Sequence, residues 1–219
     1  GKGAEAGVEQ YGKDIKDIKA ENRLLKQADM KLKEAQNAQQ RGDAQSALKA
    51  IQERDKLIAE YNHYKMTTGA TLEAAKSALI DKVAVNLAGG THHAYRSKGS
   101  GFCVFNDAAI AARVILKDSI AQERGIQKIG ILDLDVHQGD GTASILRNDV
   151  SICTVSIHGE KNYPFEKEES GLDIALPDGS GDETYLIALD RALEYLDHQK
   201  VQFLVYLAGA DPFYKDRLG

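Results

Sequence analysis

The sequence predicts an α/β protein in which a parallel sheet is flanked by helices and preceded by a helical hairpin. Residues 4–64 contain no proline and are rich in Ala, Lys, Glu and Gln, a composition typical of helix. After Met66, short apolar runs alternate with longer helical patterns. Because these runs are continuously apolar, they indicate parallel strands that are covered on both faces.

Residues 1–65 are predicted to form a helical hairpin or coiled-coil-like arm. An apolar seam with spacings of three and four residues is formed by Val8, Tyr11, Ile15, Ile18, Asn22 and Leu25. Arg41-Gly42-Asp43 then interrupts the pattern, and Asp43 can cap a second helix. This turn is similar to that of a tetratricopeptide unit, but one such unit cannot form a solenoid. We expect a solvated helical pair that mediates self-association or partner binding and has no chemistry of its own.

Residues 66–219 are predicted to form the α/β domain. The expected helices span residues 70–82, 104–123 and 182–199, and the expected strands span residues 83–87, 128–134, 151–157 and 201–207. In open sheets of this kind, ligands bind beyond the carboxyl ends of the strands. The segments that follow the four strands should therefore open on one rim.

Composition and charge limit the possible functions. The chain has 219 residues, of which 42% are hydrophobic and 28% charged, so it can bury a sizeable core. We expect no membrane association, because no apolar run approaches the roughly 18 residues of a membrane span. The net charge of −5 provides no overall electrostatic attraction to a nucleic acid. Cys103 and Cys153 lack Cys-x-x-Cys spacing, so we expect reduced thiols in a cytoplasmic protein.

An Asp-x-His pair, Asp135 and His137, follows the second predicted strand. Alternate residues of an extended chain point to the same side, so one carboxylate and one imidazole can approach a common point. Mixed oxygen and nitrogen ligands suit a divalent ion such as zinc, and Asp211 after the last strand is the natural third ligand. The alternatives are a buried Asp–His hydrogen bond and, at Asp211-Pro212, an ordinary turn.

Tandem histidines, His92 and His93, follow the first predicted strand. A metal-activated water that attacks a carbonyl needs a base and then an acid, and histidine serves as both near neutral pH. Asp133 and Asp140 flank the Asp-x-His pair, and each can orient one imidazole. The alternative for a His-His pair in a loop is simple exposure to solvent.

Five ordered blocks resemble the zinc-dependent histone deacetylase family, which has the arginase-deacetylase fold, and in particular its bacterial members close to the class IV eukaryotic enzymes. The blocks are residues 89–94, 100–107, 133–141, 155–161 and 209–212. The resemblance covers about residues 66–219. It implies zinc-dependent hydrolysis of an acyl-amide, with an acetyl-lysine peptide or a related small acetylated amine as substrate.

The resemblance also implies a role for each candidate site residue. His93, backed by Asp140, would be the general base and acid, and His92, backed by Asp133, its electrostatic partner. The implied zinc ligands are Asp135, His137 and Asp211. The implied acyl-lysine channel is lined by Gly101, Phe102 and Tyr163, although both aromatic residues are also compatible with an ordinary core. An implied structural potassium ion maps onto Asp133, Asp135, His137, Ser156 and Ile157.

This chain departs from the family pattern in two places. In the family, a Tyr or His that stabilises the oxyanion lies downstream of the position of Gly219, so we expect the C-terminal part of the catalytic domain to be absent here. The loss of such a donor typically costs about 100-fold to 1000-fold in turnover. Residues 1–65 do not match the usual start of the family.

Two rival functions remain open from the sequence. One is an acetylpolyamine-type amidohydrolase, and the other is a truncated protein that binds a metal or a partner without turnover. An arginase-like enzyme is disfavoured, because arginases use two metal ions and further aspartates, and this sequence contains one Asp-x-His.

Overall fold

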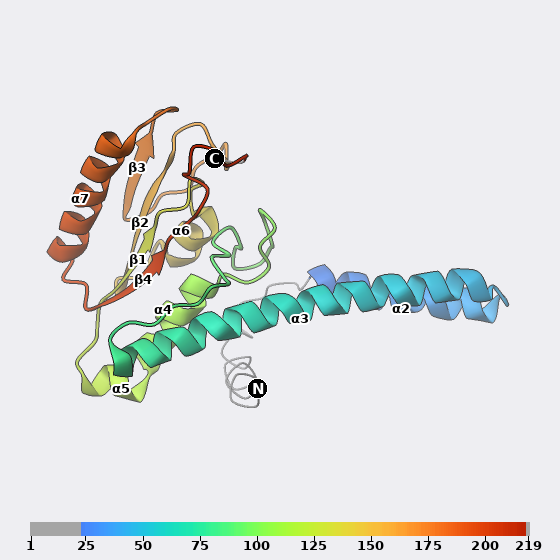
Figure 1. The fold of residues 1–219 in the computed structure, drawn as a ribbon. Helices are drawn as coiled ribbons and strands as arrows, with labels where there is room; N and C mark the ends of the chain where they lie inside the picture. The colour runs from blue at the N-terminus through green and yellow to red at the C-terminus, as the bar shows by residue number, and fades with distance from the viewer. Residues whose placement is uncertain (1–22, 218–219) are drawn as a thin grey trace.

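The computed structural model describes residues 23–217 and contains a four-stranded, fully parallel sheet flanked by helices (Figure 1). The elements are, in chain order, α2 (Arg23–Gln40), α3 (Ala44–Asp81), α4 (Asp107–Lys117), α5 (Ser119–Glu123), β1 (Ile129–Asp133), α6 (Asp140–Leu146), β2 (Ile152–Gly159), β3 (Leu172–Leu176), α7 (Asp182–His198) and β4 (Phe203–Leu207). The strand order is β3-β2-β1-β4. The predicted α/β class with a preceding helical pair is confirmed.

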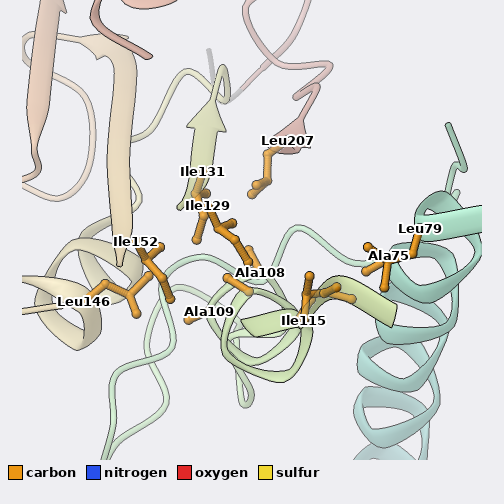
Figure 2. Close-up of a cluster of buried hydrophobic side chains, with 13 residues drawn as sticks. Ala75, Leu79, Ala108, Ala109, Ile115, Ile129, Ile131, Leu146, Ile152 and Leu207 are labelled. Carbon is orange, nitrogen blue, oxygen red and sulfur yellow. The ribbon is translucent and has the colours of Figure 1, made fainter. Parts of the chain in front are cut away.

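The central strands β1 and β2 are covered on both faces. On one face, Ile129 and Ile131 of β1 belong to a core that includes Ile115 of α4 (Figure 2). On the other face, Leu132 packs in a second core with Ala192 of α7. Successive strand residues point to opposite faces, so a continuous apolar run fills both cores. This is the physical basis of the apolar runs in the sequence.

The direction in which the chain winds through the sheet reverses beside β1. From β1 the chain passes through α6 to β2 and then to β3, and α7 returns it to β4 on the other side of β1. The two crossover helices lie on opposite faces, since α6 contributes to the first core and α7 to the second. Loops that follow the two strands at such a switch point form the usual ligand crevice. The loops after β1 and β4 therefore define the expected site.

The helices α2 and α3 form an antiparallel pair that extends away from the sheet (Figure 1). The predicted turn at residues 41–43 is confirmed, and Asp43 caps α3 by accepting a hydrogen bond of 3.0 Å from the Ser46 amide. A salt bridge of 2.9 Å between Lys31 and Glu53 connects the two helices. The predicted seam over residues 8–22 lies outside the described residues. Within residues 23–217, no helix is both long and apolar enough to cross a membrane.

The long helix α3 corrects the predicted elements around Met66. It runs without a break to Asp81, so the helix expected over residues 70–82 is its last part. Residues 83–87 form no strand, contrary to the prediction, and Leu87 is 99% exposed. Asn86 instead donates a 2.8 Å hydrogen bond to the Thr71 hydroxyl, so this run is attached to α3. The division of the chain at residues 65 and 66 stays a prediction.

Three further elements differ from the sequence-based expectation, and one of them, the short helix α6, was not predicted. The helix expected over residues 104–123 is divided into α4 and α5, because Asp118 adopts an extended conformation and caps α5 with its side chain. The edge strand β3 was not predicted. Only Ile174 of its five residues is buried, and its sequence lacks the continuous apolar run of the central strands. The remaining strands and α7 lie within two residues of their predicted bounds.

Packing at the centre of the sheet should dominate the stability of the domain. Ile131 is 1% exposed, so we expect Ile131→Ala to lower the free energy of unfolding by about 2–5 kcal/mol in urea denaturation. The matched control is Ile80→Ala on α3, where the side chain is 64% exposed and the expected loss is about 0.5 kcal/mol or less. Equal losses in the two variants would contradict this account of the core.

Candidate active site

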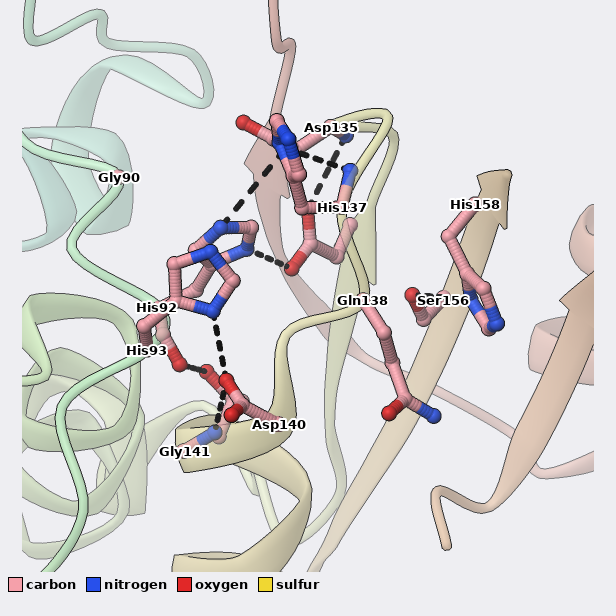
Figure 3. Close-up of polar contacts among 12 residues, drawn as sticks. Gly90, His92, His93, Asp135, His137, Gln138, Asp140, Gly141, Ser156 and His158 are labelled. Carbon is pink, nitrogen blue, oxygen red and sulfur yellow. Dashed lines mark hydrogen bonds and ion pairs between the residues drawn. The ribbon is translucent and has the colours of Figure 1, made fainter. Parts of the chain in front are cut away.

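Asp135, His137 and Asp211 meet beyond the carboxyl ends of β1 and β4. One potential ligand atom from each residue lies within 4.8 Å of the other two. His137 Nδ1 is 3.0 Å from Asp135 Oδ1 and 3.0 Å from Asp211 Oδ2. Figure 3 shows Asp135 and His137 beside the tandem histidines. The structure thus brings together the three residues that the sequence predicted as metal ligands.

Hydrogen bonds to the backbone fix the loop that carries these ligands. Asp133, the last residue of β1, accepts a 3.1 Å bond from the amide of Asp135, and Asp135 accepts a 2.8 Å bond from the amide of His137. Asp211 accepts a 3.0 Å bond from the amide of Val136, which ties the β4 loop to the β1 loop. Asp133 and Asp135 therefore each fix the backbone of the next candidate ligand, and Asp211 holds the two loops together.

The donor set fits a divalent cation. In tetrahedral coordination with ligand distances of about 2.0–2.1 Å, neighbouring donor atoms are about 3.3 Å apart, close to the 3.0 Å separations found here. Burial and the neighbouring Asp135 carboxylate raise the pKa of Asp211, and the amide of Val136 opposes this only in part. Two half-buried carboxylates close to each other are costly without a positive partner, and a bound cation provides one.

Each of the tandem histidines is paired with a buried aspartate. His92 Nδ1 lies 2.6 Å from Asp133 Oδ2. His93 Nδ1 lies 2.6 Å from Asp140 Oδ1 (Figure 3). These bonds leave the Nε2 atom of each ring available for other partners, and His92 Nε2 is 3.8 Å from Asp135 Oδ1. The four residues predicted to form two His–Asp pairs are therefore next to the three candidate ligands.

Asp140 is held in its charged form at the first turn of α6. Burial alone would raise its pKa, but hydrogen bonds from His93 and Tyr95 outweigh burial and lower it. The Tyr95 hydroxyl donates to Asp140 Oδ2 at 2.9 Å, and the Gly141 amide donates to Oδ1 at 2.9 Å. Sequence reasoning missed Tyr95, and its place two residues after His93 was the available signal.

The pair of His92 and Asp133 predicts a pH dependence of stability. Burial would lower the pKa of His92, but the Asp133 carboxylate outweighs burial and raises it to about 9. A raised pKa stabilises the folded protein fully below the ordinary value of 6.5, and this contribution is lost as the pH rises through about 9. We expect the free energy of unfolding of the metal-free protein to fall by at most about 3 kcal/mol over this range.

Urea unfolding of EDTA-treated protein across that pH range measures this effect. Asp133→Asn should flatten the profile, because the charge that raises the pKa of His92 is removed. Stability that stays constant or increases over this range in the unsubstituted protein would contradict the prediction.

The predicted channel residues lie around His93. Gly101 has a φ of 49°, and a Cβ atom there would lie 2.4 Å from His93 Cδ2, so only glycine fits. The Tyr163 ring makes an edge contact with the His93 ring at 4.9 Å between centroids, and its hydroxyl lies 2.8 Å from Ser100 Oγ. Phe102 is 93% exposed, which excludes the alternative of a core aromatic for this residue. Ser100 was not predicted as a partner.

The tandem histidines reach this region differently from the prediction. Because residues 83–87 form no strand, His92 and His93 follow an irregular segment and not a strand end. His158 lies within β2, is buried, and contacts Ser156 Oγ at 3.0 Å, and burial lowers its pKa. Asp133 and Ser156 are neighbours in the sheet register. The potassium site at Asp133, Asp135, His137, Ser156 and Ile157 stays a prediction.

Comparisons with known proteins agree with this geometry. The family model described as the histone deacetylase domain matches residues 21–219. The chain therefore belongs to the histone deacetylase family, as the sequence blocks predicted. The match begins at residue 21, so it also includes α2 and the first part of α3, up to about residue 65, which the resemblance in the sequence did not cover.

Three similar proteins illustrate the relationship. An uncharacterised protein of Picosynechococcus sp. is 49% identical over 153 residues, which cover 69% of this chain and 49% of that protein. A probable deacetylase of Archaeoglobus fulgidus is 32% identical over 174 residues, which cover 73% of this chain and 46% of that protein. The crystal structure of an acetylpolyamine aminohydrolase from Burkholderia pseudomallei matches this structure with a TM-score of 0.61 at 27% identity. The match covers 73% of this chain and 49% of that protein. The chain spans about half the length of the curated relatives it matches.

Proposed function

We propose that this domain hydrolyses the acyl-amide bond of an acetylated amine, with Zn²⁺ held by Asp135, His137 and Asp211. The observation that carries this proposal is the convergence of a carboxylate, carboxylate and imidazole donor set with two buried His–Asp pairs. Zinc bound there would act as a Lewis acid toward the substrate carbonyl and lower the pKa of water. Membership of the histone deacetylase family supports deacetylation as the reaction.

The other side chains of the site have separate roles in the proposed reaction. His93, held at Nδ1 by Asp140, presents Nε2 as the base that takes a proton from the attacking water and then passes it to the leaving amine. His92, whose pKa is raised by Asp133, supplies positive charge beside the reacting carbonyl. The backbone carbonyl of Gly101 accepts a hydrogen bond from the N–H of the substrate amide. The side chains of Phe102 and Tyr163 border the path of the acyl chain.

Acetyl-lysine peptides and acetylated polyamines are the two candidate substrates. The relative named a probable deacetylase supports deacetylation in general. The likeness to a solved acetylpolyamine aminohydrolase supports the second candidate in particular. Both substrates present the same acetamide on a flexible amine, so the residues described here serve either one.

The proposal is tested by measuring zinc content and turnover on the same preparation. We expect about one zinc ion per chain after dialysis, and release of acetate from an acetyl-lysine peptide or from acetylspermidine. The ratio of the two kcat/KM values identifies the substrate class. Bound zinc without turnover on any acyl-amide would overturn the hydrolase and favour a protein that binds metal only. Turnover that survives complete removal of zinc would overturn the metal assignment.

A further inference from the structure

The tandem histidines lie in a segment that depends on other elements for its conformation. Residues 83–106 connect α3 to α4 and contain no helix and no strand. Such a segment keeps its side chains in place only through hydrogen bonds and packing with its surroundings. Both imidazoles are nevertheless buried and held at 2.6 Å from their carboxylate partners. The contacts that restrain the backbone near His92 and His93 therefore matter for the site.

Asp107, the first residue of α4, is one such restraint. Its side chain is almost fully buried, and each of its oxygens lies within hydrogen-bond distance of two donor groups. Oδ1 accepts the amide and the hydroxyl of Thr91, both at 2.8 Å. Oδ2 accepts the amide of Gly90 at 3.1 Å and the hydroxyl of Thr71 at 2.7 Å. A buried carboxylate is costly unless it is fully hydrogen-bonded, and here its partners are the two amides directly before His92.

Thr71 connects this restraint to the long helix α3. Its hydroxyl donates to Asp107 and accepts from Asn86 Nδ2 at 2.8 Å. Gly89 packs directly against the same groups, with a φ of 116°. A Cβ atom at Gly89 would lie 2.4 Å from Asp107 Oδ2 and 2.7 Å from Thr71 Oγ1. The backbone before the histidines is thus in close contact with α3 and α4 together.

The same helix reaches the histidines from a second side. Tyr64 precedes Thr71 by seven residues, so both lie on one face of α3. The Tyr64 hydroxyl donates a 2.7 Å hydrogen bond to the carbonyl of Phe102. Phe102 follows Gly101, which packs against the His93 ring. One face of α3 therefore restrains both the segment before His92 and the segment that covers His93.

We propose that α3 is part of the active-site scaffold and that Thr71 and Asp107 are positioning residues for the tandem histidines. Neither residue touches the reacting atoms, and both act through the amides of Gly90 and Thr91. The catalytic consequence rests on the proposed function. The effect of Thr71 and Asp107 on the order of the backbone at Gly90 and Thr91 can be measured without any turnover.

The experiment compares Thr71→Val and Asp107→Asn with matched controls in the full chain. Thr71→Val removes the hydroxyl but keeps a β-branched side chain, and Thr71→Ser restores the hydroxyl. The control Thr67→Val removes a hydroxyl that bonds only within its own helix, at 3.0 Å from the Tyr64 carbonyl. The control Asp182→Asn removes the same charge at the first residue of another helix, α7, where the side chain is exposed. Two readouts are the hydrogen exchange of the Gly90 and Thr91 amides and the imidazole NMR signals of His92 and His93.

We expect exchange at Gly90 and Thr91 to accelerate about tenfold or more in Thr71→Val and Asp107→Asn, with altered imidazole signals. Thr71→Ser, Thr67→Val and Asp182→Asn should resemble the unsubstituted protein. With an active preparation, kcat should fall in the first two variants while zinc content is retained. Exchange and imidazole signals that are unchanged in Thr71→Val would overturn the proposal. An unsubstituted protein without turnover would instead count against the proposed function, and the exchange measurement would still decide the positioning.

Discussion

Replacing Asp135 or His137 by alanine is expected to abolish zinc retention and, with it, deacetylation. Each substitution removes one of three protein ligands, and the remaining pair of donors cannot hold the ion against dialysis. His137 Nδ1 also lies 3.0 Å from both carboxylates, so its loss leaves Asp135 and Asp211 without the imidazole between them. Zinc content by elemental analysis and acetate release by assay check the two parts of this prediction.

The control for the ligand variants is Asp178→Ala. Asp178 is exposed and makes one long ion pair of 3.4 Å with Lys161, away from the candidate ligands. This variant should retain zinc and activity. If Asp135→Ala and His137→Ala both kept the zinc stoichiometry of the unsubstituted protein, the ligand assignment would be wrong, whatever happened to turnover.

Replacing His93 by glutamine is expected to lower kcat by about 100-fold to 10,000-fold while zinc is retained. The side chain is held at Nδ1 by Asp140 and is the candidate for both proton transfers. Asp140→Asn should cost less, about 10-fold to 100-fold, because the imidazole remains but loses its fixed orientation. Steady-state kinetics with zinc analysis of the same samples separate this effect from loss of the metal.

An exposed histidine provides the control for this second experiment. His198 lies at the end of α7, so His198→Gln should leave kcat and zinc content unchanged. A His93→Gln variant with turnover close to that of the unsubstituted protein would contradict the role of His93 as base and acid. Loss of zinc from His93→Gln would show that this residue supports the metal site instead.

Local sequence patterns predicted the central sheet but misread one apolar run. The strands β1 and β2 were predictable, because central parallel strands need apolar side chains on both faces. The edge strand β4 was predictable from its apolar composition, although Leu204 and Tyr206 are exposed. Residues 83–87 have a similar composition, yet Asn86 is hydrogen-bonded to Thr71 of α3 and the run lies outside the sheet. The choice depends on a contact between residues 15 positions apart, which no short window of sequence contains. The edge strand β3 escaped prediction for the opposite reason, since its partial burial weakens the apolar pattern.

The sequence by itself determined which side chains form the site and how two of them lie relative to each other. Asp135 and His137 are close in space because they are close in the chain, directly after a strand. Their approach to Asp211 was decided by the tertiary structure, because it requires β4 to pair with β1 and not with β3. The pairing of each tandem histidine with its own aspartate was equally beyond local pattern, since 41 and 47 residues separate the partners. Strand order and long-range hydrogen bonds are set by how whole elements pack, whereas local sequence sets only burial, capping and turns.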